Sequence, residues 1–181
     1  MPRLFVALRP PEPVRDALID TMEALDGARW QDDEQLHLTL RFAGEVERRT
    51  AEDLAGALSR VEMDPFDVEL TGVGHFERKG RPHAVWAHAL PSPALAALQK
   101  SIERACRAAG LPPERRAFHP HVTIARLNRS TAPIGAWLAR HGTLRASWRA
   151  DTFGLYQSHL THSGSLYELV ERYPGMALQI P

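Results

Sequence analysis

The chain has 181 residues, of which 44% are hydrophobic, and its 22 basic side chains balance 22 acidic ones. This length suits one domain with a substantial core, and the composition excludes a disordered or fibrous protein. A neutral chain is unsuited to coating long nucleic acids, which requires a net basic face, although a small local basic site is allowed. The single cysteine, Cys106, excludes an intrachain disulfide and a cysteine-based zinc site, and it is expected to be buried in a helix.

The first sixty residues predict strand, helix, strand and helix in turn. The apolar run 4–8 predicts a buried strand, which is too short for a signal-peptide core or a membrane span. Apolar residues over 14–25 follow at helical spacing, with Gly27 as the predicted stop. Residues 36–42 alternate as a strand, and Thr50 is the predicted cap of the next helix. We expect a cytoplasmic protein without membrane contact.

The remainder of the chain predicts more strands than helices. Ser92, followed by proline at the first helical position, marks the start of a long helix that Gly110 ends. A short helix begins at Pro133, and the polar residues 158–164 indicate a turn. Alternating patterns predict strands over residues 66–73, 84–90, 121–127, 144–156 and 165–173.

The order strand, helix, strand occurs twice, and each time the last strand carries an H-x-T-x tract. The tracts begin at His37 and His121, which are 84 residues apart, close to half of the chain. This repeated order of elements predicts a single domain over residues 1–181, built of two similar lobes that face each other across a cleft. The two halves share too little sequence to establish a duplication.

Two further H-x-T matches, at His141 and His159, are set aside for physical reasons. Chance alone supplies about 0.5 such matches in a chain of this composition, so a single match carries little information. Gly142 follows His141 after a predicted helix, where a helix stop is expected. The tract at His159 lies in the predicted polar turn and lacks an apolar fourth residue. Only the tracts at His37 and His121 alternate as half-buried strands do.

Alternation places each of these histidines beside a threonine. In a strand, residues i and i+2 share a face, so His37 lies with Thr39, and His121 lies with Thr123. Two such strands facing each other would surround one small volume with two imidazoles and two hydroxyls. This set suits phosphodiester chemistry, because one imidazole can deprotonate the attacking oxygen while the other protonates the leaving oxygen. The hydroxyls could donate to phosphate oxygens, and a cation would offset the developing charge.

A metal site is the alternative interpretation of the second tract. His119 and His121 are one strand step apart, so both can lie on one face. However, Pro120 between them weakens a regular strand, and no carboxylate lies at ligand spacing. We therefore expect neither a metal nor another cofactor.

Five segments along nearly the whole chain resemble one known family. They are RLFVALRPP, RW...LHLTLRFAGEV, GVGHF, FHPHVTIAR and LYQSHLTHSGSLYELVERYP, in the family's order. The chain resembles the two-histidine phosphoesterase superfamily, and within it the LigT-like RNA 2′,3′-cyclic phosphodiesterases, also called 2′-5′ RNA ligases. The paired tracts are typical of the superfamily, and the flanking segments favour this branch.

The resemblance implies a bilobal, pseudo-symmetric α+β fold, with an antiparallel sheet in each lobe, helices outside and a central cleft. It implies metal-independent hydrolysis of RNA 2′,3′-cyclic phosphate ends to 2′-phosphomonoesters. His37 would be the proton donor and His121 the proton acceptor. RNA termini or small cyclic nucleotides would be the partners, and we expect a monomer without a protein partner.

Two arginines are candidates for the phosphate-binding cation. The resemblance favours Arg126, although strand parity from His121 places it on the opposite face unless a twist or bulge intervenes beyond Ala125. Arg41 has the same parity as His37, so regular strand geometry favours it instead. Phe76, in the GVGHF segment, could stack on a base, but core packing is the favoured role.

Other functions of the same pocket stay open. They are a 2′-5′ RNA ligase, a 2′-5′ oligonucleotide or cyclic nucleotide phosphodiesterase, and a non-catalytic nucleotide-binding module. Because both histidines and both threonines are present, the last of these is disfavoured. A zinc-dependent hydrolase is a further alternative, which added chelator would expose.

Overall fold

The computed structural model describes residues 1–174, which form nine strands, four α-helices and a short 3₁₀ helix, η1 (Asp33–Gln35). The α-helices are α1 (Glu12–Ile19), α2 (Arg48–Leu58), α3 (Pro93–Ala108) and α4 (Gly135–His141). The strands are β1 (Arg3–Leu8), β2 (Arg29–Trp30), β3 (Leu38–Glu45), β4 (Phe66–Arg78), β5 (Arg81–Ala89), β6 (His121–Arg126), β7 (Arg145–Ala150), β8 (Phe153–Thr161) and β9 (Gly164–Tyr173).

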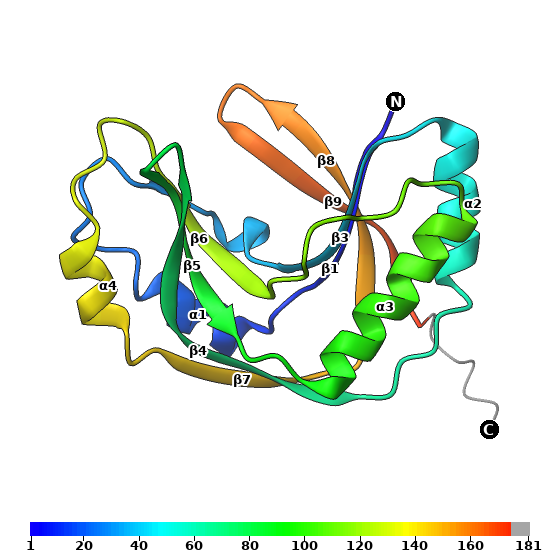
Figure 1. Cartoon of the computed structure of the whole chain (residues 1–181), viewed down its shortest axis with the longest axis horizontal. Helices are drawn as coiled ribbons and strands as arrows, with labels where there is room; N and C mark the ends of the chain where they lie inside the picture. The colour runs from blue at the N-terminus through cyan, green and yellow to red at the C-terminus, as the bar shows by residue number, and fades with distance from the viewer. Residues whose placement is uncertain (175–181) are drawn as a thin grey trace.

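The strands form one curled antiparallel sheet in the order β7-β4-β5-β6-β3-β1-β8-β9, with β2 paired to β6 (Figure 1). Its two halves have matching pairings, β6-β5-β4-β7 from the middle of the chain and β3-β1-β8-β9 from both ends. The halves meet at β3 and β6, where Leu38 and Val122 are the single registered pair. The fold is α+β as expected, and the sheet predicted for each lobe is one half of this joined sheet.

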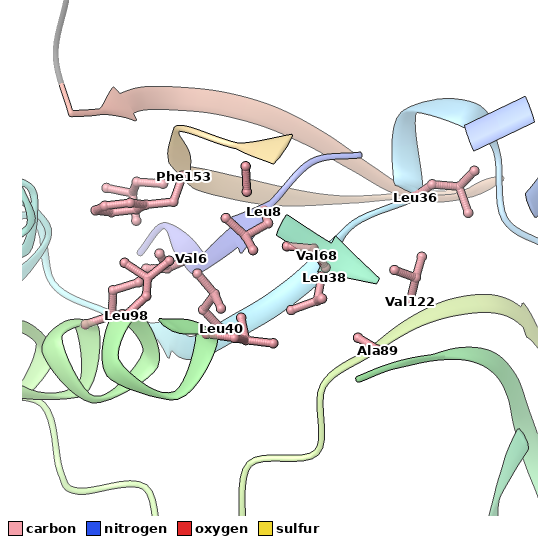
Figure 2. Packing of buried hydrophobic residues seen from close by; sticks show 14 of the residues in the cluster. Val6, Leu8, Leu36, Leu38, Leu40, Val68, Ala89, Leu98, Val122 and Phe153 are labelled. Atoms are coloured by element: carbon pink, nitrogen blue, oxygen red, sulfur yellow. The ribbon is translucent and has the colours of Figure 1, made fainter. Parts of the chain in front are cut away.

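The helices lie in two groups, α1 and α4 toward one end of the curled sheet and α2 and α3 toward the other (Figure 1). Helices α2 and α3 lie together, with α3 against β3, whereas α1 packs against β7 and α4 against β4. Side chains from β1, β3, β4, β6 and α3 meet in the core (Figure 2). Leu38 and Val122, the second residues of the two tracts, are completely buried there. Burial of each such side chain stabilises the fold by about 1.5–3 kcal/mol, and it directs the neighbouring histidines and threonines to the opposite face.

Several of the predicted element boundaries are wrong. Helix α2 begins at Arg48, so Thr50 lies inside this helix rather than capping it. Helix α1 ends at Ile19 rather than near residue 25, because the chain turns before Ala24, which adopts a φ of 52°. The predicted strand 144–156 is two strands, since β7 ends at Ala150 and β8 begins at Phe153. Leu25 and Ala150 are nonetheless buried, so their apolar character reflects packing rather than the continuity of an element.

The predicted polar turn 158–164 is also wrong. Strand β8 continues through Thr161, which pairs with Gly164 at the start of β9, so the turn is only two residues long. Several polar residues of this hairpin line a cavity, and they therefore lack the apolar alternation by which a strand is recognised. Among the described residues, no helix is long and apolar enough to cross a bilayer.

Candidate active site

One cavity of about 760 Å³ brings the two H-x-T-x tracts together. It lies at the junction of β3 and β6, where the antiparallel register sets His37 beside Thr123 and Thr39 beside His121. All four side chains line this cavity. The structure thus places both predicted imidazoles and both predicted hydroxyls around one volume.

The two histidine rings are held in the same way. His37 Nδ1 lies 2.6 Å from the carbonyl oxygen of Gln35, and His121 Nδ1 lies 2.6 Å from that of His119. Because a carbonyl only accepts hydrogen bonds, each Nδ1 carries the proton and donates it. Nε2 of each ring then remains to exchange protons with a substrate, which is the atom that acid–base catalysis needs.

Aromatic rings support each histidine. Phe5 lies 4.8 Å from the His37 ring, and Tyr167 meets it edge-on at 5.1 Å. Phe76 meets His121 edge-on at 4.9 Å, with Trp86 at 5.9 Å. These contacts, together with the Nδ1 hydrogen bonds, hold both rings in defined orientations.

Burial lowers the pKa of both histidines. The pKa of His37 falls to about 4, because desolvation outweighs the hydrogen bond to Gln35 and nearby positive groups, including Arg126, lower it further. The pKa of His121 is lowered by the same main cause, again with a contribution from Arg126. Without an anion nearby, both rings are therefore neutral at pH 7. A phosphate in the cavity would favour the charged form of either ring.

Each tract contains a β-bulge at its fourth residue. In the pairing of β1 with β3, Val6 faces Arg41 and Ala7 faces Thr39, so Leu40 is the extra residue. In the pairing of β5 with β6, the partners step from Thr123 to Ala125, so Ile124 is the extra residue. A bulge exchanges the two faces of the strand beyond it. The residue that returns to the cavity is therefore three positions after the threonine, not two.

The bulge at Ile124 directs Arg126 into the cavity, beside His121 and Thr123. The predicted interruption of the strand exists, although it lies one residue before Ala125 rather than beyond it. Arg126 is exposed and has no ion-pair partner among residues 1–174. Its guanidinium is therefore available to an anion held between the histidines.

The bulge at Leu40 removes Arg41 from the cavity, so its placement by strand parity is wrong. Arg41 is buried against α3, where its guanidinium forms an ion pair with Glu103 and donates to the carbonyl oxygen of Pro112. Phe42 takes the corresponding place on the cavity wall and is 51% exposed. The equivalent positions of the two tracts thus carry an aromatic ring in one half and a cation in the other.

Comparison with known proteins places the chain in a family. A family model described as the 2′-5′ RNA ligase superfamily matches residues 10–161. The chain belongs to the 2′-5′ RNA ligase superfamily. An RNA 2′,3′-cyclic phosphodiesterase of Aeropyrum pernix is 34% identical over 141 residues, which cover 76% of this chain and 80% of that protein. A Thermus thermophilus protein of the same name is 31% identical, with 94% and 89% of the two chains covered.

Solved structures agree with this membership of the superfamily. The crystal structure of the Thermus thermophilus protein TT0787 matches with a TM-score of 0.76 and 28% identity, covering 94% of this chain and 96% of that one. Escherichia coli LigT complexed with 3′-AMP matches with a TM-score of 0.75 and 25% identity, covering 96% and 98%. The curled sheet and its helices are therefore those of LigT-like proteins.

The remaining residues singled out by sequence lie in different places. Phe76 is half-buried, packs on His121 and lines the cavity. The same ring can therefore support His121 and contact a ligand. His141 ends α4, away from the cavity. His159 lies on β8 and pairs with Glu168, rather than lying in a turn. Within residues 1–174, no group of three metal-ligating side chains has suitable geometry.

Sequence reasoning missed the residues that tie the β8–β9 hairpin to the cavity. Gln35 Nε2 donates to the carbonyl oxygen of Ser165 at 2.7 Å, and Gln35 Oε1 accepts from the backbone N–H of Asp32 at 2.9 Å. Arg29 donates to the carbonyl oxygen of Ser163 at 3.0 Å. Only the Asp32-x-x-Gln35 spacing, which is that of a capping box, could have drawn attention to Gln35. The contacts to the hairpin span more than 100 residues of sequence and have no local signal.

Proposed function

We propose that this protein hydrolyses the 2′,3′-cyclic phosphate at an RNA end to a 2′-phosphomonoester, using His37 and His121 as an acid/base pair. The observation that carries the proposal is the matched pair of imidazoles on one cavity, each with Nδ1 bound to a backbone carbonyl. Several relatives named RNA 2′,3′-cyclic phosphodiesterase support the substrate class.

In the proposed reaction, His121 Nε2 removes a proton from water, and the water oxygen attacks phosphorus opposite the 3′-oxygen. The bond between phosphorus and the 3′-oxygen breaks as His37 Nε2 protonates that oxygen. Thr39 and Thr123 donate to the non-bridging oxygens, and Arg126 offsets the charge that develops there. The phosphate stays on the 2′-oxygen, so one water is consumed and no other reactant is needed.

The choice of His37 as proton donor and His121 as proton acceptor rests on the family resemblance, because the two rings have equivalent hydrogen bonds. The low pKa of His37 requires that the substrate itself promotes protonation of this ring. A cyclic phosphodiester carries one negative charge, and an opposite charge at contact distance raises a histidine pKa by about 1–3 units. Binding and acid catalysis are thereby coupled in the proposed mechanism.

Each half of the sheet would act as one lobe and contribute one histidine and one threonine. The single domain of two lobes, the monomeric state and the cytoplasmic location expected from the sequence stay predictions. A 2′-5′ ligase activity would use the same residues, with a 5′-hydroxyl of RNA in place of water as the group that attacks phosphorus.

The test is to incubate the pure protein with an oligonucleotide ending in a 2′,3′-cyclic phosphate, in the presence of EDTA, and to identify the product by phosphorus NMR. The expected product is a 2′-phosphate, formed at the same rate with or without chelator. A 3′-phosphate would overturn the assigned orientation. Loss of activity in EDTA with recovery on added zinc would overturn the metal-independent mechanism.

A further inference from the structure

The cavity is much more basic than the chain as a whole. The chain is neutral, yet four arginines line this cavity against a single carboxylate, that of Asp32. Arg116 is engaged with Glu114, which leaves Arg3, Arg29 and Arg126 as cavity arginines without an ion pair among residues 1–174. One phosphate between the histidines accounts for Arg126 but not for the others.

Arg29 and Arg126 are direct cross-strand partners in the pairing of β2 with β6. Residues directly opposite each other share a face of the sheet, and like charges in such positions repel. Neither arginine has a carboxylate to offset this repulsion in the described part of the chain. An anionic ligand that contacts both Arg29 and Arg126 would offset their repulsion, because guanidinium groups bind phosphate through short, charge-assisted hydrogen bonds.

The position of Arg29 is defined by the β8–β9 hairpin. Its guanidinium donates to the carbonyl oxygen of Ser163 at 3.0 Å. A Cβ atom at residue 164 would lie 2.8 Å from the Arg29 guanidinium, and Gly164 has a φ of +131°, so glycine permits this approach. Arg29 therefore lies between Arg126 and the hairpin tip, and it lines the same cavity as the two histidines.

We infer that Arg29 forms a second phosphate subsite, which binds the phosphodiester linking the terminal nucleotide to the preceding one. The inference rests on the proposed function, and it narrows the substrate from any 2′,3′-cyclic nucleotide to an oligonucleotide end. Arg126 binds the reacting cyclic phosphate, and Arg29 binds the neighbouring phosphate of the same strand. A cyclic mononucleotide lacks that second phosphate and cannot contact Arg29 in this way.

The experiment compares three substrates: 2′,3′-cyclic AMP, the dinucleotide ApA with a 2′,3′-cyclic phosphate, and the same dinucleotide with an uncharged methylphosphonate linkage. For the wild-type protein, kcat/KM should be about tenfold higher for the charged dinucleotide than for the other two, the size expected of one charged hydrogen-bonded contact. The variant Arg29→Gln should lose this preference, and Arg29→Lys should retain part of it. Arg129→Gln, which alters an exposed arginine outside this cavity, should keep the full preference.

Two results would overturn the inference. One is that Arg29→Gln keeps the preference for the charged linkage. The other is that it lowers kcat/KM equally for all three substrates, which would mean that Arg29 only holds the hairpin. Calorimetric binding of the products, adenosine 2′-phosphate and ApA 2′-phosphate, separates this inference from the proposed function. An Arg29-dependent preference in binding without any turnover would retain the subsite and refute the hydrolysis.

Discussion

The two candidate catalytic histidines resemble each other in hydrogen bonding but are set apart from ordinary histidines by burial. Burial lowers the pKa of His37 to about 4 and lowers that of His121 as well. The proposed mechanism nevertheless requires one ring to be charged while the other is neutral. The active form of the free protein is therefore most abundant between the two apparent pKa values of the pair, both of which lie below the ordinary value of about 6.5.

This electrostatic arrangement predicts that the pH profiles of kcat/KM and of kcat have different optima. The profile of kcat/KM reports the free protein, so its bell should have an optimum below pH 6.5 and should fall as the pH rises through neutrality. The profile of kcat reports the complex, in which the phosphate stabilises an imidazolium, so its optimum should lie about one pH unit or more higher. The substrate phosphodiester does not titrate in this range. If the two pH profiles coincided, with an optimum above pH 7, they would contradict the assignment of His37 and His121 as the acid/base pair.

At the residue scale, strand parity predicted that both histidines and both threonines line one cavity, as they do, but it exchanged Arg41 and Arg126, of which the family resemblance favoured Arg126. Alternation holds from His37 to Thr39 and from His121 to Thr123, because the burial of Leu38 and of Val122 enforces it. Parity counting then fails for Arg41 and Arg126, because each tract bulges at its fourth residue. No residue type in a single sequence marks such a bulge.

At the scale of elements, the β8–β9 hairpin is tied to the H-x-T-x tract of His37 through Gln35. The side chain of Gln35 donates to Ser165 on the hairpin, while its backbone carbonyl accepts from His37. The same side chain accepts from the N–H of Asp32, as in a capping box. One residue thus joins the hairpin, the start of η1 and the orientation of His37.

Substitution of Gln35 can separate these contacts. Gln35→Glu keeps an acceptor for Asp32 but cannot donate to Ser165, whereas Gln35→Ala loses both contacts. We expect kcat to fall for Gln35→Glu and to fall further, on the order of tenfold, for Gln35→Ala, because small misplacements of a catalytic group are costly. Gln99→Ala, on α3, is the control. Equal activity of all three variants would show that the hairpin does not position His37.

A glycine on β4 makes room for the aromatic ring beside His121. A Cβ atom at Gly74 would clash with the Trp86 ring, which is 5.9 Å from the His121 ring. We expect Gly74→Ala to displace Trp86 and to lower the free energy of unfolding by about 1–3 kcal/mol, the usual cost of overpacking, with reduced kcat. Urea unfolding followed by tryptophan fluorescence measures the stability change.

The matched control for this prediction is Gly56→Ala. This glycine lies in α2, and a Cβ atom there would have no neighbour within 4 Å. Substitution should be neutral or stabilising by about 0.4–1 kcal/mol, because alanine restricts the unfolded chain. If Gly74→Ala behaved like Gly56→Ala, the close contact with Trp86 would not limit the fold.

Most elements could be predicted from the sequence, but several of their ends could not. The Ser92 cap is confirmed, since its hydroxyl accepts from the N–H of Leu95 at 3.1 Å. The hairpin was mistaken for a turn at 158–164, because several of its residues are polar and line the cavity. Polarity alone does not distinguish a residue that faces a ligand from one that faces bulk water.

At the scale of the whole molecule, the repeated strand–helix–strand order of the sequence corresponds to two sheet halves with matching pairing order. What the sequence could not predict is how the halves join. They share a continuous sheet through the single registered pair of Leu38 with Val122, and one half is assembled from both ends of the chain. Such pairings join segments far apart in sequence, so no local pattern encodes them. The proposed mechanism nevertheless depends on this junction, because it brings one histidine from each half to one cavity.

The most direct test of this account is the turnover of ApA 2′,3′-cyclic phosphate by His37→Ala and His121→Ala in the presence of EDTA, with circular dichroism to verify folding and His159→Ala as the control. Each cavity variant should lose about 10²–10⁴-fold in kcat, the usual contribution of a general acid or base, and the control should match the wild type. A correctly folded His37→Ala or His121→Ala protein with near-normal kcat would contradict the two-histidine mechanism.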